Sequence, residues 1–289
     1  MNPLNFEFIA AMLKQASGLA LGMDKGYLLE SRLSPVAKKH GCRNLDELVA
    51  RLRTGRAKEI VDDVVDAMTT NESFFFRDVK PFDALREKIL PTMLQHRAAT
   101  RTLRIWCAAA STGQEPYSLA MVLQEEASNL AGWACDILAT DISNEALTRA
   151  TAGIYSQFEV QRGLTIQRLM VHFDKKDANW QIKPELRRKI QYRYFNLLDD
   201  PKPLGRFDIV YCRNVLIYFD QPTKARVLDS IARVMNDHGV LVLGGAETVF
   251  GVSEAFKPWG GQHGLYSLAS PRVALSTGSP QSLGMAVAK

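Results

Sequence analysis

The chain has 289 residues, of which 46% are hydrophobic, and a formal net charge of +5. This composition suits a globular protein of about two domains with a real core, and it excludes a disordered or fibrous chain. The charge fits an anionic partner but lacks the density of a nucleic-acid-binding arm. No run reaches the roughly 18 apolar residues of a membrane helix. Glu7 and Lys14 interrupt the apolar start, so we predict no secretory signal.

The four cysteines are Cys42, Cys107, Cys135 and Cys212. No pair of them has metal-ligand spacing. Three lie in stretches that we predict to be buried strands, so we interpret them as thiols of the core. The sequence therefore predicts no metal site, and a reducing cytoplasm is the simplest compartment.

Residues 1–78 have the pattern of a small all-helical domain. Apolar residues recur at helical spacing in four stretches, which glycines or a capping asparagine separate. These stretches cover residues 6–16, 29–37, 45–52 and 60–68. No strand pattern occurs among them.

The second stretch and the turn after it are basic. Their cationic or titratable side chains are Arg32, Lys38, Lys39, His40 and Arg43. A solvated helix face is the simpler interpretation of this cluster. A docking surface for an acidic protein partner is the functional one.

Residues 69–77 are polar except for three adjacent phenylalanines. Asn71 and Ser73 can donate and accept hydrogen bonds, and Arg77 carries a fixed fork of donors. The aromatic residues could simply join two domains while the polar residues face a ligand. Residues 79–102 then form a predicted linker with a lead-in helix, which we expect to end at Pro91.

Residues 103–269 alternate strands with helices, which predicts a parallel α/β sheet with right-handed crossovers. Residues 103–110 are an apolar run, residues 111–113 form a turn of small residues, and a helix begins near Glu115. A strand, a tight turn and a helix N-terminus form the cofactor-binding start of an open α/β sheet, although a plain strand-to-helix joint looks the same. The nicotinamide fingerprint and the phosphate-loop lysine are absent from this turn.

Polar residues follow two further predicted strands. Asp141 comes at the end of one strand, and Arg213 and Asn214 come at the end of another. Ligands of open α/β sheets bind at this edge, and a carboxylate after the second strand suits the hydroxyls of a ribose. Asp141 could instead cap the next helix, a role that Ser143 could also fill. A buried arginine without a function is uncommon, and Tyr218 could face the same cleft.

Residues 155–195 interrupt the alternation. A turn cluster at residues 174–179 is followed by short stretches with strand-like alternation, the last at residues 190–194. We predict a small antiparallel β insertion with an exposed hairpin. Residues 270–289 are rich in Ser, Pro, Gly and Ala, and we predict a disordered tail there.

Together, these motifs resemble those of the chemotaxis receptor methyltransferases, the CheR family. The resemblance covers about residues 5–268, and its motifs occur in the family's order. They are residues 70–77 (TNESFFFR), 109–118 (AASTGQEPYS), 139–142 (ATDI), 196–198 (NLL) and 212–219 (CRNVLIYF). Ser73 stands where threonine is common, which keeps the hydroxyl, and Gln114 stands where glutamate is common.

The resemblance implies a Rossmann-like class I S-adenosylmethionine-dependent methyltransferase domain with a small antiparallel β insertion, preceded by a small all-helical N-terminal domain. It implies methylation of glutamate side chains of chemoreceptors, the methyl-accepting chemotaxis proteins, which yields methyl esters and S-adenosylhomocysteine. By the same likeness, nine residues would contact the cofactor. They are Asn71, Ser73, Arg77, Glu115, Asp141, Asn196, Leu197, Arg213 and Asn214.

A glutamate acceptor has a reference pKa of about 4.3, so it is ionised at neutral pH and needs no general base. We therefore assign orientation of the acceptor to two candidate catalytic residues, Arg77 and Tyr218. By resemblance, Arg32, Lys38, Lys39 and Arg43 would dock the acidic methylation region of the receptor. In some family members the β insertion also binds a receptor C-terminal peptide, which the sequence leaves open here. We expect no nucleic-acid partner and no membrane insertion, and we expect a cytoplasmic protein recruited to receptor arrays.

Two alternatives stay open. One is a methyltransferase for another substrate, such as a nucleic acid or a small molecule. Adenine methyltransferases carry Asn/Asp-Pro-Pro-aromatic after the fourth strand, and this chain has Cys-Arg-Asn-Val there, at residues 212–215, which argues against that substrate. Cytosine methyltransferases use a nucleophilic Cys after Pro, a pair that this sequence lacks. The other alternative is a non-catalytic module that binds S-adenosylmethionine, against which Arg77 and Tyr218 argue.

Overall fold

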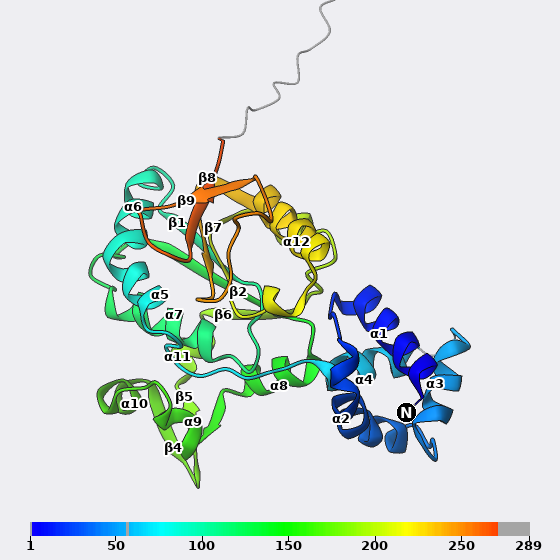
Figure 1. Ribbon diagram of the computed structural model, residues 1–289. Coiled ribbons are helices and arrows are strands. Elements are labelled where there is room, and N and C mark those ends of the chain that lie inside the picture. Colours follow the sequence, from blue (N-terminus) through cyan, green and yellow to red (C-terminus); the bar gives the residue numbers. More distant parts are fainter. Residues whose placement is uncertain (1, 56–57, 271–289) are drawn as a thin grey trace, which may run out of the picture.

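The computed structural model describes residues 2–55 and 58–270. Figure 1 shows a cluster of helices beside a sheet that carries helices on both faces. The segment between these two parts crosses below the sheet to α5. The predicted disordered tail lies, apart from residue 270, outside the described residues.

The four predicted N-terminal helices are confirmed. They are α1 (Pro3–Ser17), α2 (Gly26–Lys39), α3 (Leu45–Arg53) and α4 (Lys58–Met68), with a short 3-10 turn at Met23–Lys25. The side chain of Asn44 accepts from the backbone N–H of Glu47 and so caps α3. Gly18, with φ of 81°, ends α1 in a conformation that glycine adopts without strain. Ile9, Leu33 and Val64 lie in their shared core.

The sequence predicted that the lead-in helix ends at Pro91, and this prediction is wrong. It runs through α5 (Lys80–Ala84), a π turn (Leu85–Ile89) and α6 (Leu90–His96). Proline lacks an N–H and clashes with the carbonyl four residues earlier in a regular helix. The wider π turn directly before Pro91 is the irregularity that lets the helix continue.

The central sheet has seven strands in the order β6-β2-β1-β7-β8-β10-β9. The strands are β1 (Thr102–Cys107), β2 (Ala134–Asp141), β6 (Ile190–Tyr194), β7 (Phe207–Cys212), β8 (Met235–Leu243), β9 (Phe256–Pro258) and β10 (Leu265–Leu268). The first five in this order are parallel, and β10 and β9 pair in antiparallel fashion. The chain goes outward from β1 to β2 and β6, then returns to β7 beside β1. This reversal is the switch point at which open α/β sheets bind ligands.

Helices cover both faces of the sheet, which explains why its strands are apolar on both sides. Leu103, Ile105 and Cys107 of β1 pack in one core with α7 (Gln114–Glu125). Trp106 packs in the opposite core, together with residues of α12 (Gln221–Val234). Helix α8 (Asn144–Ala152) contacts β2 and β6. All four cysteines are free thiols and three are buried, whereas Cys135 is partly exposed.

The insertion is a separate three-stranded antiparallel sheet in the order β3-β5-β4. Its strands are β3 (Ile154–Ser156), β4 (Phe173–Lys176) and β5 (Asn179–Ile182), and its short helices are α9 (Gln157–Gln161), α10 (Ile166–His172) and α11 (Pro184–Arg187). The assignment of residues 190–194 to this insertion is wrong, because they form β6, which pairs parallel to β2 in the main sheet. Alternation of apolar and polar residues fits an edge strand of either sheet and does not identify its partner.

Three polar contacts hold α1 and the residues after it against the sheet domain. The N–H of Ala20 donates to the carbonyl of Tyr218 at 2.9 Å. The side-chain amide of Asn196 donates to the carbonyl of Ala16 at 2.6 Å. Lys14 pairs with Asp220 at 2.6 Å. Within the described residues, no helix combines the length and the apolarity that a membrane crossing requires.

Candidate active site

One pocket lies where β1, β2 and β7 end, between the sheet domain and the N-terminal helices. All nine residues that the sequence analysis assigned to a cofactor line it, and so does Tyr218. They come from five separate parts of the chain, so folding brings together what the sequence separates. Four N-terminal residues, Ser17, Leu19, Val65 and Met68, also line the pocket. The sequence analysis assigned no such role to the N-terminal helices.

The turn between β1 and α7 is tight because of Gly113. Its φ is 97°, and a Cβ there would lie 2.9 Å from both the Ala150 Cβ and the Tyr155 hydroxyl. No other residue fits this position without strain and displacement. The turn also holds Ser111 at a positive φ of 49°. Ala109 and Ser111 of this turn line the pocket.

Asp141 connects this turn to the end of β2. One carboxylate oxygen accepts from the Ser111 N–H at 2.7 Å and the other from the Ser143 N–H at 2.9 Å. Ser143, not Asp141, caps α8 with its side chain. Burial raises the pKa of Asp141, and the hydrogen bonds from these N–H groups oppose the rise. A carboxylate offers about four lone-pair sites, so Asp141 can still accept from hydroxyl groups in the pocket.

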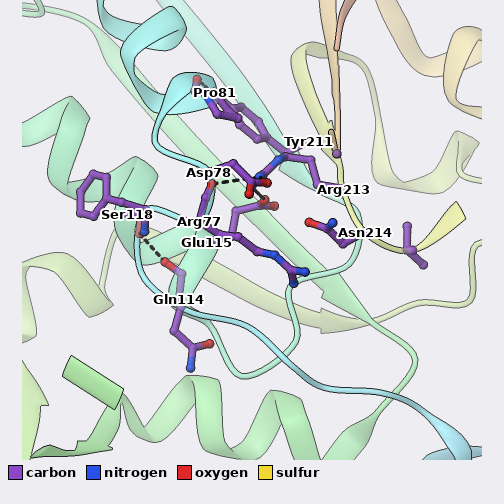
Figure 2. Close-up of polar contacts among 12 residues, drawn as sticks. Arg77, Asp78, Pro81, Gln114, Glu115, Ser118, Tyr211, Arg213 and Asn214 are labelled. Atoms are coloured by element: carbon purple, nitrogen blue, oxygen red, sulfur yellow. Dashed lines mark hydrogen bonds and ion pairs between the residues drawn. The ribbon is translucent and has the colours of Figure 1, made fainter. Parts of the chain in front are cut away.

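Arg213 and Glu115 form a buried ion pair at 2.9 Å, which Figure 2 shows. Their side chains are 1% and 10% exposed. Burial raises the pKa of Glu115, and the charge of Arg213 opposes that rise. Burial alone would lower the pKa of Arg213, but Glu115 and Asp78 raise it above its ordinary value. The arginine is therefore held charged.

Arg213 also fixes the segment that precedes α5. Its Nη2 donates to the carbonyl of Arg77 at 2.9 Å and to the carboxylate of Asp78 at 2.7 Å. Its Nε is buried and has no hydrogen-bond partner among the described residues. Asp78 was not among the predicted site residues, although it directly follows the TNESFFFR motif. The end of β7 and the motif are thus joined through one side chain.

The segment at residues 71–77 divides between the core of the sheet domain and the pocket. Phe75 and Phe76 are buried in the main core, whereas Asn71, Ser73 and Arg77 line the pocket. The Arg77 guanidinium donates to the carbonyl of Glu72 at 2.9 Å and lies 5.5 Å from the ring centre of Phe74. The Asn71 carbonyl accepts from the Ser111 hydroxyl at 3.0 Å. These contacts hold the segment over the β1–α7 turn.

The insertion contacts the same segment from outside. Arg162 pairs with Glu72 at 2.9 Å and lies 4.4 Å from the ring centre of Phe74. Arg168 lies 3.8 Å from the ring centre of Phe76 and pairs with Glu125 of α7 at 2.8 Å. The insertion therefore packs against the back of the pocket-lining segment.

The four residues predicted to dock a substrate do not line the pocket. They lie on α2 and the turn after it. Arg32 is half-buried and donates to the carbonyls of Met68 and Thr69 at 3.0 and 2.8 Å. Lys39 pairs with Asp63 at 2.7 Å. The other two, Lys38 and Arg43, are exposed, and Arg43 pairs with Glu47 at 3.3 Å.

One buried carboxylate next to the pocket was missed altogether. Glu247 is 5% exposed and follows β8, which ends at the same edge of the sheet. It accepts hydrogen bonds from the backbone of the segment that begins at Asn214. The pattern Gly-Gly-Ala-Glu after a buried strand was the only sequence signal for it.

This chain is similar to known proteins over most of its length. Residues 71–265 match the model for the CheR methyltransferase SAM-binding domain, and residues 4–69 match the model for the CheR methyltransferase all-alpha domain. The chain is 41% identical over 258 residues to "Chemotaxis protein methyltransferase Cher2" of Pseudomonas putida, covering 88% of this chain and 94% of that protein. It is 43% identical over 249 residues to "Chemotaxis protein methyltransferase 1" of Pseudomonas aeruginosa, covering 85% and 90%. It is 41% identical over 248 residues to the protein of the same name in Vibrio cholerae, covering 85% and 89%.

Proposed function

We propose that this chain, which belongs to the CheR methyltransferase family, transfers the methyl group of S-adenosylmethionine to glutamate side chains of chemoreceptors. It would then be a protein-glutamate O-methyltransferase whose products are glutamate methyl esters and S-adenosylhomocysteine. The observation that carries the proposal is the convergence of nine motif residues on one pocket. The relatives described above are named as chemotaxis methyltransferases, which supports the receptor as substrate.

The side chains of the pocket fit S-adenosylmethionine. Asp141 can accept from the ribose hydroxyls with its free lone pairs. Glu115 offers a carboxylate for the ammonium of the methionine part, and the unpaired Nε of Arg213 offers a donor for an anionic or carbonyl oxygen. Leu197 and Phe219 add apolar surface to the lining.

The bound cofactor supplies a methyl group on a sulfonium, which is already activated for transfer. An ionised glutamate would accept this methyl group directly, with S-adenosylhomocysteine as the leaving product, and no proton would have to move. The protein therefore needs to orient the acceptor and exclude water, not to provide a base. Arg77 can hold the acceptor carboxylate with its fork of donors, and the Tyr218 hydroxyl can donate beside it. Both residues line the pocket.

We assign Lys38 and Lys39 of α2, together with Arg43 of the turn after it, to docking of the receptor's acidic methylation region. Arg32 belongs to this face in sequence, but its bonds to two backbone carbonyls give it a structural role as well. The insertion is our candidate for a receptor C-terminal peptide, because β3 and β4 are edges that a further strand can join. We also propose a cytoplasmic location with recruitment to receptor arrays.

The proposal is tested by incubating the protein with methyl-labelled S-adenosylmethionine and chemoreceptor-containing membranes. We expect label in the receptor, released as methanol by mild alkali, because a carboxyl methyl ester is alkali-labile. Alkali-stable label would contradict ester formation and indicate another methyl acceptor. Binding of the cofactor without any transfer, with receptors from the same source as the protein, would favour the non-catalytic alternative.

A further inference from the structure

The carboxylate of Glu247 gathers an unusual number of backbone donors. Five N–H groups donate to its two oxygens, and four of these are consecutive. The donors are Asn214 (2.8 Å), Val215 (2.9 Å), Leu216 (2.8 Å), Ile217 (3.3 Å) and Gly244 (2.8 Å). Glu247 is 5% exposed, so water competes little for these bonds.

These bonds define the shape of the loop that follows β7. Asn214 has φ of 57°, a left-handed conformation that residues other than glycine rarely adopt. Turning the chain this way points successive N–H groups at one place, which forms an anion-binding concavity. A carboxylate offers about four lone-pair sites and bonds that are stronger than those of a neutral acceptor. The loop therefore keeps its shape because Glu247 occupies that concavity.

The loop carries two residues of the pocket. Asn214 lines the pocket at the start of the loop, and Tyr218 lines it one residue after the last bonded N–H. Figure 2 shows Asn214 beside the Arg213–Glu115 pair. We propose that Glu247 is a positioning residue for methyl transfer, which sets the places of Asn214 and Tyr218 by holding the backbone between them.

This inference rests on the proposed function and adds one point to it. Because Glu247 occupies the N–H groups of residues 214–217, a receptor carboxylate cannot use them. Side chains remain available to orient the acceptor, and Arg77 and Tyr218 are our candidates. Glu247 itself does not line the pocket.

Two neighbouring glycines provide a matched pair of variants. A Cβ at Gly244 would lie 2.7 Å from a Glu247 oxygen and 3.0 Å from the Asn214 N–H nitrogen. A Cβ at Gly245 would have nothing within 4 Å. Gly244→Ala therefore disturbs the contact between Glu247 and the loop and also crowds the side-chain amide of Asn214 at 3.0 Å, whereas Gly245→Ala introduces the same methyl group with nothing within 4 Å.

The experiment compares Glu247→Gln and Gly244→Ala with wild type and Gly245→Ala. The glutamine keeps the size of the side chain but turns an NH2 group toward N–H donors. We expect kcat for receptor methylation to fall roughly tenfold in the first two variants, with a smaller change in the calorimetric Kd for S-adenosylhomocysteine. Gly245→Ala should stay near wild type. Equal kcat in all four proteins would overturn the inference.

Two further readouts separate positioning from a general loss of structure. In Glu247→Gln, amide hydrogen exchange should become faster in residues 213–218 but not in α7. Unchanged exchange in this loop would overturn the inference. This readout does not depend on whether the wild type methylates receptors. Tyr218→Phe should cost much less kcat in the Glu247→Gln background than in wild type. Full additivity of the two substitutions would mean that Glu247 does not act through Tyr218. Failure of the wild type to methylate any receptor would instead defeat the proposed function.

Discussion

The pocket and the basic face of α2 hold their charged residues in opposite ways. In the pocket, Arg213 is buried and its partners come from α7 and the segment before α5. On α2 and the turn after it, Lys39 and Arg43 are exposed and pair with carboxylates of the same helical cluster. Long-range pairing under burial fixes one geometry, whereas exposed pairs are weak and exchange readily. We therefore expect substitutions to act strongly in the pocket and weakly on α2.

The largest effect is expected for Arg213→Ala. This change leaves the buried carboxylate of Glu115 unpaired and frees Asp78 from its partner. Removing one member of a buried ion pair typically costs about 3–5 kcal/mol. Chemical denaturation should show a loss of this size, together with a loss of cofactor binding. Arg226→Ala, an exposed arginine on α12, is the control and should change stability by less than about 0.5 kcal/mol.

A large effect on turnover, without unfolding, is expected for Arg77→Ala. The side chain is only partly buried, and its removal breaks one bond to the Glu72 carbonyl. If Arg77 orients the acceptor, kcat should fall by roughly a hundredfold, as for the loss of one donor in a preorganised site. The Kd of S-adenosylhomocysteine should change much less. A loss confined to cofactor affinity would contradict the catalytic assignment.

An intermediate effect, dependent on pH, is expected for Asp141→Asn. Losing one charged acceptor should weaken cofactor binding about tenfold at neutral pH. Burial raises the pKa of Asp141, so its carboxylate protonates at a higher pH than the ordinary value of 3.8. The affinity of the wild type for the cofactor should therefore fall as the pH decreases, and the fall should begin above pH 3.8.

The asparagine variant lacks this titration, so its affinity should change less with pH than that of wild type. Any remaining dependence would come from Glu115, whose pKa is also raised by burial. Calorimetry over a series of buffers measures both proteins. Parallel pH profiles would mean that Asp141 does not contact the cofactor as a carboxylate.

The smallest effect is expected for Lys38→Glu on α2. This residue is exposed, and its reversal should raise the Michaelis constant for the receptor by about threefold, since single exposed charges contribute little. The Kd for the cofactor should not change. Lys202→Glu, an exposed lysine of the sheet domain, is the control. Equal Michaelis constants in both variants would argue against docking on α2.

The sequence predicted those parts of the fold that depend on local patterns. Helix periodicity located α1 to α4, and the motifs at the strand ends named the residues that meet in the pocket. Residues 190–194 were placed wrongly because alternation does not reveal which strand is the neighbour. The helix beyond Pro91 was missed because a π turn has no simple sequence pattern.

The site residues that sequence reasoning missed depend on distant partners. Glu247 is a single glutamate in a glycine-rich stretch, and its role comes from N–H groups about thirty residues earlier. Likewise, the charge of Arg32 suggested docking, while its bonds to the carbonyls of Met68 and Thr69 appear only in three dimensions. A sequence shows which side chains are charged, but it does not show which distant groups form hydrogen bonds with them.

A crystal structure of the protein with S-adenosylhomocysteine tests the central claim most directly. The claim is that the residues gathered at the ends of β1, β2 and β7 form the cofactor site. We expect the product in this pocket, with its ribose hydroxyls bonded to Asp141 and its sulfur facing the side of Arg77 and Tyr218. Product bound elsewhere, or bound here with its ribose away from Asp141, would contradict the account.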